Sequence, residues 1–203
     1  MPRLDSPLVL MATALPAEAA PLRRRFALER RQPDLAFPVY RNERMALTLS
    51  GVGKLNAAAA TAALGTLYHN SRHALWLNVG IAGHTVMAIG DAFMAERVTD
   101  RASGRQWIPG FAVAPPCPTL PLETVDTPDF DYRDDTAVDM EAAGFTAAAR
   151  RFADAGKVHC FKVISDNRGQ PGHGIGGKTV SRLIEEHLDL LERLIEQFSP
   201  EPG

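Results

Sequence analysis

The sequence is poor in cysteine, in charge of one sign and in long apolar runs. Its two cysteines, Cys117 and Cys160, have no second cysteine or histidine at ligand spacing, which excludes a disulfide framework and a zinc ribbon. The apolar run at 8–14 is soon followed by Pro16 and lacks the length and flanks of a signal peptide, and no run reaches membrane-spanning length. We therefore expect a cytoplasmic protein that does not bind a membrane.

The charge is nearly balanced, with 22 Lys and Arg against 24 Asp and Glu and a formal net charge of -2. There is no excess of basic residues of the kind that binds nucleic acid, so a small molecule is the expected ligand. The 203 residues, 45% of them hydrophobic, suffice for one sizeable core. We expect a single domain over residues 1–203.

Strand and helix signals alternate along the first half of the chain. Apolar runs at 7–13, 45–49 and 74–79 predict buried strands, and 17–28 and 55–68 predict the helices after the first two. A fourth strand is expected at 91–98, followed by a loop without a helix. The alternation predicts an α/β fold with a mostly parallel sheet.

The second half is less regular. Prolines cluster at 109–135, which allows at most an edge strand at 120–125. The pattern then predicts a helix at 136–155, a strand at 158–164 and one long amphipathic helix at 178–198. His187 lies on the apolar stripe of that last helix, where a packed histidine is expected rather than a ligand.

The segment 172–179, from Gly172 to Thr179, matches the phosphate-binding pattern G-x-x-x-x-G-K-[ST]. Its context argues against a P-loop nucleotide triphosphatase. The preceding strand is expected to end near Ile164, some residues too early, and only one helix follows, so no downstream strand can carry a magnesium-binding Asp. The triphosphatase is kept as a minor alternative.

Three acids stand where strands end or helices begin. Glu18 follows the first strand, Glu141 lies among small and apolar residues at an expected helix start, and Asp166 ends an apolar strand. Glycine turns follow two further strands, at Gly51 and Gly80. Because ligands of α/β folds bind at the carboxyl edge of the sheet, one crevice could collect all of these groups.

Five short motifs resemble those of the nucleoside phosphorylase and nucleosidase superfamily, closest to the methylthioadenosine/S-adenosylhomocysteine nucleosidases. They appear in the family's order: Ala14-Leu15-Pro16-Ala17-Glu18, Ser50-Gly51-Val52-Gly53-Lys54-Leu55-Asn56-Ala57-Ala58, Asn78-Val79-Gly80-Ile81-Ala82-Gly83, Asp139-Met140-Glu141-Ala142-Ala143 and Ile164-Ser165-Asp166. The resemblance implies a three-layer fold, with a central mixed, mostly parallel sheet flanked by helices, and no cofactor or metal.

The resemblance also implies cleavage of the bond between a purine and a ribose. Asp166 would be the general acid toward N7 of the departing base, with Ser165 orienting it. Glu141 would accept hydrogen bonds from the ribose hydroxyls, Met140 would pack on the sugar, and Glu18 would orient or deprotonate the attacking water. Val52 would line the pocket near the 5′ end of the sugar, and the loop at Gly80 and Ile81 would complete it.

Water is favoured over phosphate as the attacking group. The hexameric phosphorylases place an arginine just before the third-strand glycine loop, where this chain has Leu77-Asn78, and Glu18 would repel phosphate. A phosphorylase remains the alternative.

The chain departs from the nucleosidase pattern in two places. Ile81 replaces a serine that helps to hold the water, and the 109–135 segment is shorter than its counterpart, which supplies the aromatic residue that stacks on the base. Trp107, Phe130 and Tyr132 are the candidates for that aromatic role.

The resemblance leaves the substrate open among methylthioadenosine or adenosylhomocysteine, another 5′-substituted nucleoside such as futalosine or a nucleoside-capped lipid, and a plain purine nucleoside. A catalytically silent nucleoside-binding protein is a further alternative. A homo-oligomer, dimer or hexamer, is expected, for which the alanine-rich helix at 55–68 could serve as an interface.

Overall fold

The computed structural model describes residues 8–31, 36–68, 71–132 and 135–198. The strands are β1 (Val9–Thr13), β2 (Glu29–Arg31), β3 (Val39–Arg41), β4 (Met45–Leu49), β5 (Leu75–His84), β6 (Ala92–Asp100), β7 (Gln106–Trp107), β8 (Thr119–Thr124), β9 (Ala137–Asp139) and β10 (Val158–Asn167). The helices are α1 (Pro16–Arg25), α2 (Lys54–Leu67), α3 (Ala142–Ala149), α4 (Gly177–Glu185) and α5 (Leu188–Phe198), with short 3₁₀ turns η1 (Ser71–His73) and η2 (Ala155–Lys157).

One mixed sheet forms the centre of the molecule. Strands β4, β1, β5 and β10 pair in that order and run parallel. Beyond β4 the sheet continues through β3 and β2, which are antiparallel. Beyond β10 it continues through β6, β8 and β9, and β9 meets β5 again at Gly83. The carboxyl ends of β1, β5 and β10 therefore share one edge, which is where the predicted site residues follow their strands.

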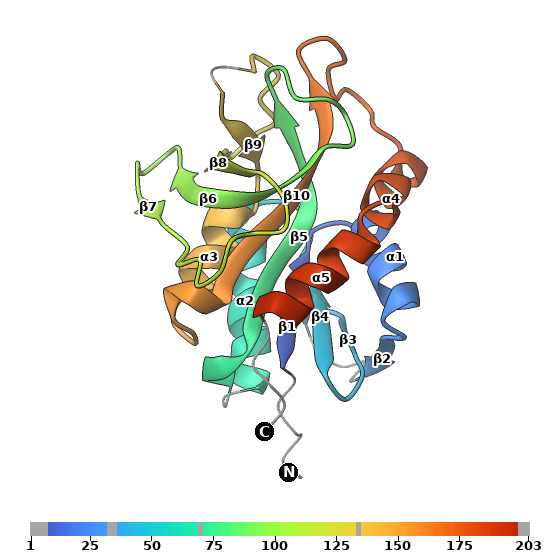
Figure 1. The fold of residues 1–203 in the computed structure, drawn as a ribbon, viewed down its shortest axis with the longest axis vertical. Coiled ribbons are helices and arrows are strands. Elements are labelled where there is room, and N and C mark those ends of the chain that lie inside the picture. The colour runs from blue at the N-terminus through green and yellow to red at the C-terminus, as the bar shows by residue number, and fades with distance from the viewer. Residues whose placement is uncertain (1–7, 32–35, 69–70, 133–134, 199–203) are drawn as a thin grey trace.

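Helices cover both faces of this sheet (Figure 1). α2 and α3 pack with one hydrophobic cluster that includes Trp76 and Phe145, and α1, α4 and α5 pack with a second that includes Leu77 and Phe161. Strand β5 is buried almost throughout because its alternate side chains enter the two clusters. The predicted α/β fold, with a central mixed sheet between helices, is confirmed.

The proline-rich segment contains a strand, as predicted, but not at an edge. β8 lies between β6 and β9 and runs parallel to both. Pro121 has no N–H to donate, and it pairs with Arg97 at a register shift in β6, between Ala95 and Arg97. A bulge on the neighbouring strand thus accommodates a proline in the interior of the sheet.

The helix predicted at 136–155 is wrong at both ends, because α3 covers only Ala142–Ala149. Residues 137–139 form β9, and α3 begins only at Ala142. The Asp139 carboxylate accepts hydrogen bonds from the Ala142 N–H at 2.8 Å and from the Thr124 hydroxyl at 2.7 Å. It thereby holds a sharp strand-to-helix turn that the run of small residues did not reveal.

The single C-terminal helix predicted at 178–198 is two helices, α4 and α5, separated at Glu186 and His187. The His187 ring nitrogen Nε2 lies 2.5 Å from the Gly90 carbonyl oxygen in the β5–β6 connection. His187 is therefore a packed residue, as predicted, and its contact lies where the helix breaks. The short strands β2 and β3 were not predicted.

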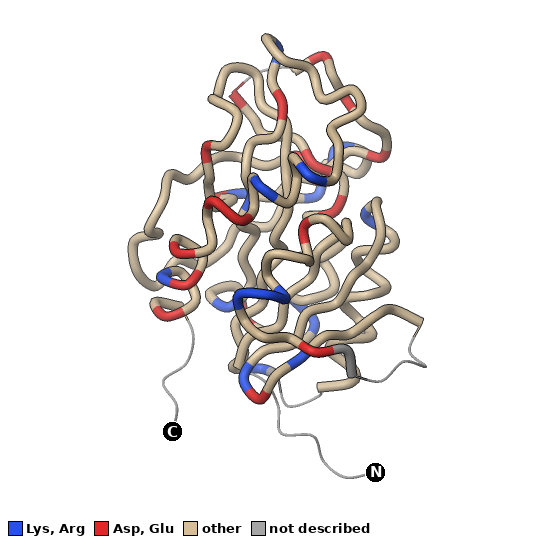
Figure 2. Tube along the Cα trace, turned by 90° about the vertical axis from the view of Figure 1, so that its right-hand side faces the viewer, with Lys and Arg blue, Asp and Glu red and all other residues tan. Residues whose placement is uncertain are grey.

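Charged residues of both signs are interspersed along the chain (Figure 2). Within the described ranges, no helix has the length and apolar character needed to cross a membrane.

Candidate active site

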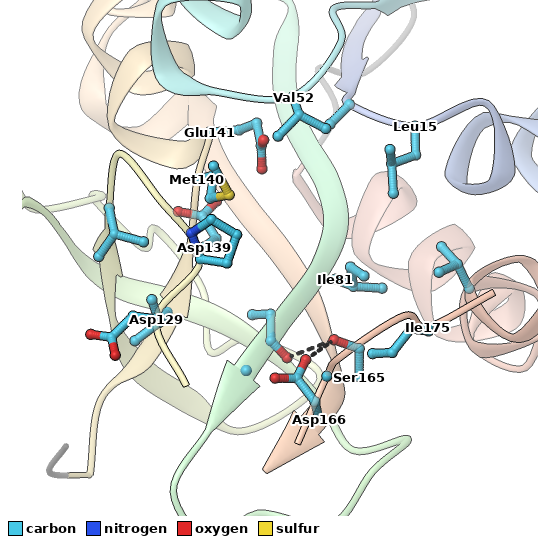
Figure 3. A pocket seen from close by; sticks show the side chains of 18 of the residues that line it. Leu15, Val52, Ile81, Asp129, Asp139, Met140, Glu141, Ser165, Asp166 and Ile175 are labelled. Carbon is cyan, nitrogen blue, oxygen red and sulfur yellow. Dashed lines mark hydrogen bonds between the residues drawn. The ribbon is translucent and has the colours of Figure 1, made fainter. Parts of the chain in front are cut away.

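A pocket of about 350 Å³ opens at the carboxyl edge of the sheet. Its lining includes most of the residues predicted for the site: Glu18, Val52, Ile81, Met140, Glu141, Ser165 and Asp166. Gly80, also predicted, lies behind the lining, against Glu18. Figure 3 shows Val52, Leu15 and Glu141 toward one end of the pocket and Ser165 and Asp166 toward the other. Segments far apart in the chain thus converge on one cavity of the size expected for a small ligand.

Glu18 lies in the first turn of α1 and its side chain turns back over the strand ends. Oε2 accepts hydrogen bonds from the Ala14 and Leu15 N–H groups, both at 2.9 Å, and Oε1 accepts one from the Ile81 N–H at 3.1 Å. Ile81 therefore contributes its backbone to the site as well as an apolar side chain. Burial raises the pKa of Glu18, while Lys162 and the backbone donors oppose that shift.

Gly80 allows two charged groups to meet above the sheet. A Cβ atom at this position would lie 2.8 Å from Glu18 Oε1 and 3.3 Å from Lys162 Nζ. The lysine is on β10, paired in register with Gly80 on β5. Any larger residue at 80 would displace one of these groups.

Lys162 is a buried charged residue behind the pocket lining that the sequence analysis did not single out. It is buried, and its ammonium forms an ion pair with Asp139 at 2.8 Å. Burial opposes the charge of Lys162, but Asp139, then Glu141 and Glu18, more than offset this and raise its pKa. A lysine inside the otherwise apolar run of β10 was the available signal, because a buried ammonium requires acidic partners.

Glu141 stands at the start of α3, as predicted, and faces the glycine turn before α2. Its Oε1 accepts a hydrogen bond from the Gly53 N–H at 2.8 Å. Gly53 has φ +102°, a conformation that suits glycine and turns its N–H toward the pocket. Burial, followed by the nearby charge of Asp139, raises the pKa of Glu141 to about 7.

Asp166 lies near the carboxyl end of β10, beyond a register shift between Ile164 and Asp166. Its Oδ1 accepts the Ser165 hydroxyl at 2.5 Å, and its Oδ2 accepts the Tyr132 hydroxyl at 2.5 Å. The contact with Ser165 was predicted. The contact with Tyr132 was not.

The three aromatic candidates occupy different places. Phe130 lines the pocket and stacks on His173 with ring centroids 4.0 Å apart. Tyr132 is buried against Asp166, and Trp107 lies on β7, outside the pocket lining. Phe130 is therefore the candidate whose position suits stacking on a ligand.

The glycine-rich segment at 172–179 forms the loop before α4 and the first turn of that helix. Gly172, Gly174 and Ile175 line the pocket, and the Gly172 N–H donates to the Tyr132 hydroxyl at 3.0 Å. β10 ends at Asn167, so the loop is not the direct strand-to-helix turn of a P-loop. The segment is part of the pocket wall.

No group of three or more His, Cys, Asp or Glu side chains in the described part of the chain could hold a metal ion. The pocket instead offers carboxylates, hydroxyls and backbone N–H groups. This set suits proton transfer and the binding of a polar ligand with a partly apolar surface.

Comparison with known proteins shows which solved structures share this fold. No family model matches the chain, and no curated protein matches its sequence. Solved structures do match: 5′-methylthioadenosine nucleosidase from Arabidopsis thaliana in apo form is 18% identical with a TM-score of 0.80, covering 98% of both chains. An MTA/SAH nucleosidase is 16% identical with a TM-score of 0.73, covering 95% of this chain and 97% of that one. A futalosine hydrolase mutant from Helicobacter pylori is 12% identical with a TM-score of 0.71, covering 93% and 98%. The chain has the fold of these nucleosidases.

Proposed function

We propose that this protein hydrolyses the N-glycosidic bond of a purine nucleoside. The observation that carries the proposal is the separation of acids within one pocket. Asp166 lies toward one end, while Glu141 lies toward the other. A nucleoside also has two different ends. Its base must leave at one end, and its sugar becomes positively charged at the other.

In the proposed reaction the base occupies the Asp166 end. Asp166 donates a proton to N7 as the bond between C1′ and N9 breaks, and the bonding electron pair leaves with the base. A water molecule attacks C1′, forming the new C–O bond, and Glu18 accepts its proton. The products are the free base and the ribose derivative, so one water is consumed for each bond cleaved.

The other end of the pocket suits the sugar. Glu141 accepts hydrogen bonds from the ribose hydroxyls, and Met140 packs on the ring. The buried carboxylates of Glu18, Glu141 and Asp139 face a single ammonium, that of Lys162. When Glu141 and Glu18 are ionised, their negative charge stabilises the positive charge that develops on the sugar, because the interaction is strong in a buried site.

The lining favours water as the attacking group. The residues found to line the pocket include Glu18, Asp129, Asp139, Glu141 and Asp166, but neither arginine nor lysine. Among these described lining residues, a phosphate dianion would meet several carboxylates and no cation. Lys162 is already engaged by Asp139.

The apolar surface near the sugar supports a nucleoside with a 5′ substituent. Val52, 47% exposed, and Leu15 lie at the end of the pocket opposite Asp166. An apolar 5′ group would cover these side chains from water. The substrates named for similar structures, 5′-methylthioadenosine and futalosine, guide the choice of compounds to test.

The test is a panel of purine nucleosides with hydroxyl, alkylthio and larger 5′ groups, incubated with and without phosphate. We expect free base to appear without phosphate, fastest for an adenosine with a 5′ substituent. Release that requires phosphate would identify a phosphorylase instead. Binding without base release would indicate a silent nucleoside-binding protein, and turnover of ATP alone would contradict the whole assignment.

A further inference from the structure

Tyr132 joins two loops above Asp166. Its hydroxyl donates to Asp166 Oδ2 at 2.5 Å and accepts from the Gly172 N–H at 3.0 Å. Tyr132 as a whole residue is only 3% exposed. Burial, followed by the hydrogen bond to Asp166, raises the pKa of Tyr132 to about 12, so the phenol keeps its proton under ordinary conditions.

These two contacts fix the direction of the hydroxyl. The Gly172 N–H can only donate, so the phenol oxygen must accept there and its one proton points at Asp166. Tyr132 is thus a one-way donor to Oδ2.

Ser165 contacts the other oxygen and has a choice of acceptor. Its hydroxyl lies 2.5 Å from Asp166 Oδ1 and 3.3 Å from the Ala82 carbonyl oxygen. When Oδ1 carries a proton, the serine proton can turn to Ala82 and the serine oxygen can accept from Oδ1. Oδ2 has no partner of this kind, because the Tyr132 hydroxyl already accepts from Gly172 and can only donate to Oδ2.

We propose that Tyr132 is a positioning residue for Asp166, which confines the transferable proton of the general acid to Oδ1 and aims that oxygen at the leaving base. When the base is bound, the Oδ1 hydroxyl turns from the serine oxygen to N7 and passes its proton to the base, and the serine hydroxyl then turns back to donate to Oδ1. Tyr132 keeps its own proton throughout. This inference rests on the proposed nucleosidase function.

The backbone conformation of Tyr132 supports a specific positioning role. Tyr132 has φ +44°, a conformation that costs free energy for a residue other than glycine. Its carbonyl oxygen accepts from Arg168 Nη2 at 2.8 Å and from the Thr85 hydroxyl at 3.1 Å. Contacts on both the carbonyl and the hydroxyl hold the residue in this strained conformation over Asp166.

The experiment is Tyr132→Phe, which removes the hydroxyl and retains the buried ring. Two substrates are compared: the best purine nucleoside, whose base needs a proton to leave, and 4-nitrophenyl β-D-ribofuranoside, whose nitrophenolate does not. We expect kcat on the purine nucleoside to fall about 10- to 100-fold with KM nearly unchanged. The rate on the nitrophenyl riboside should stay within about twofold.

Tyr68→Phe is the matched control, because Tyr68 is an equally buried tyrosine at the end of α2. It should leave both rates unchanged. A merely structural role for Tyr132 would lower both rates together, and that result, or an unchanged kcat on the purine nucleoside, overturns the proposal. If the wild-type enzyme does not cleave the nitrophenyl riboside, the purine nucleoside alone is used. A rise in KM of Tyr132→Phe for that nucleoside, without a loss of kcat, then overturns the proposal. Failure of the proposed nucleosidase function can be distinguished from failure of this inference, because the wild type would then release base from no nucleoside.

Discussion

The two ends of the pocket are built from different chemistry. At the end proposed to bind the sugar, here called the sugar end, Lys162 forms an ion pair with Asp139 and has Glu141 and Glu18 as further acidic neighbours. Backbone N–H groups donate to all three carboxylates. At the end proposed to receive the base, here called the base end, two hydroxyls donate to one carboxylate, Asp166. Phe130 also lines the pocket, with its ring centroid 6.4 Å from that of Tyr132. Fixed charge dominates the first end, and hydrogen bonds with movable protons dominate the second.

The difference matches two tasks in one reaction. A positive charge developing on a sugar is stabilised by negative groups that are already in place, so rigid amide donors and an ion pair suit that end. A leaving base needs a proton delivered at one atom, so a carboxylic acid with oriented hydroxyl partners suits the other. Disrupting the sugar end should therefore change stability and its pH dependence as well as rate, whereas disrupting the base end should change mainly rate.

The largest effect is expected at the base end. Asp166→Asn should lower kcat for base release about 10²- to 10⁴-fold, because an amide cannot supply the proton. The fold should persist, since Asn can still accept one of the two hydroxyl hydrogen bonds. Steady-state assays with circular dichroism would measure both, and Asp154→Asn, at an exposed loop position, is the control. A near-normal rate would remove Asp166 from the acid role.

At the sugar end, Lys162→Met should cost stability. Removing the ammonium leaves Asp139 buried without its ion-pair partner, and breaking a buried pair from one side costs about 3–5 kcal/mol. Urea denaturation at neutral pH would measure it, with Lys178→Met, at an exposed position, as the control. Lys162→Met combined with Asp139→Asn should recover part of the loss. A change below about 1 kcal/mol in the single variant would show that the charges at this end do not depend on Lys162.

The sequence predicted this architecture well where patterns were local. The apolar run at 45–49 is strand β4 at the same residues, and Glu141 and Asp166 stand at a helix start and near a strand end as predicted. Strand ends gather at one edge in a parallel sheet, so most of the predicted site residues could be brought together without coordinates.

Other features depend on contacts between distant segments, which periodicity does not encode. β9 was hidden in a helix-like run because the turn after it depends on Asp139 contacting Thr124 on β8. The tolerance of Pro121 within the sheet depends on the register shift in β6. Tyr132 could be proposed as an aromatic neighbour of the base, but its bond to Asp166 required the path of the whole 125–132 loop.

The next largest effect concerns the pH dependence of stability. The pKa of Glu141 is about 7 in the folded protein, against an ordinary value of 4.5. Between these two pH values the folded state holds a proton that the unfolded state has lost, so stability falls as pH rises through this window. Relative to Glu141→Gln, the wild type should lose about 2–3 kcal/mol from pH 4.5 to above 7.

Glu141→Gln keeps an oxygen that can accept from Gly53, so the comparison isolates the charge. Urea titrations across that pH range would measure the difference, and Glu43→Gln, at an exposed position, should show no such trend. A difference between wild type and Glu141→Gln that does not vary with pH would mean that burial at the sugar end does not perturb this carboxyl.

The smallest effect should come from the apolar part of the base end. Phe130 lines the pocket and its ring stacks on His173, so Phe130→Leu removes an aromatic face while keeping apolar bulk. An aromatic contact of this kind contributes about 0.5–1.5 kcal/mol, which predicts a rise in KM of roughly 3- to 10-fold with kcat unchanged. Phe111→Leu is the control, because Phe111 stacks on His159 away from the pocket lining. If kcat falls instead and KM does not change, Phe130 affects the orientation of Asp166 rather than the binding of the base. In that case the same residues at this end determine both base binding and proton transfer.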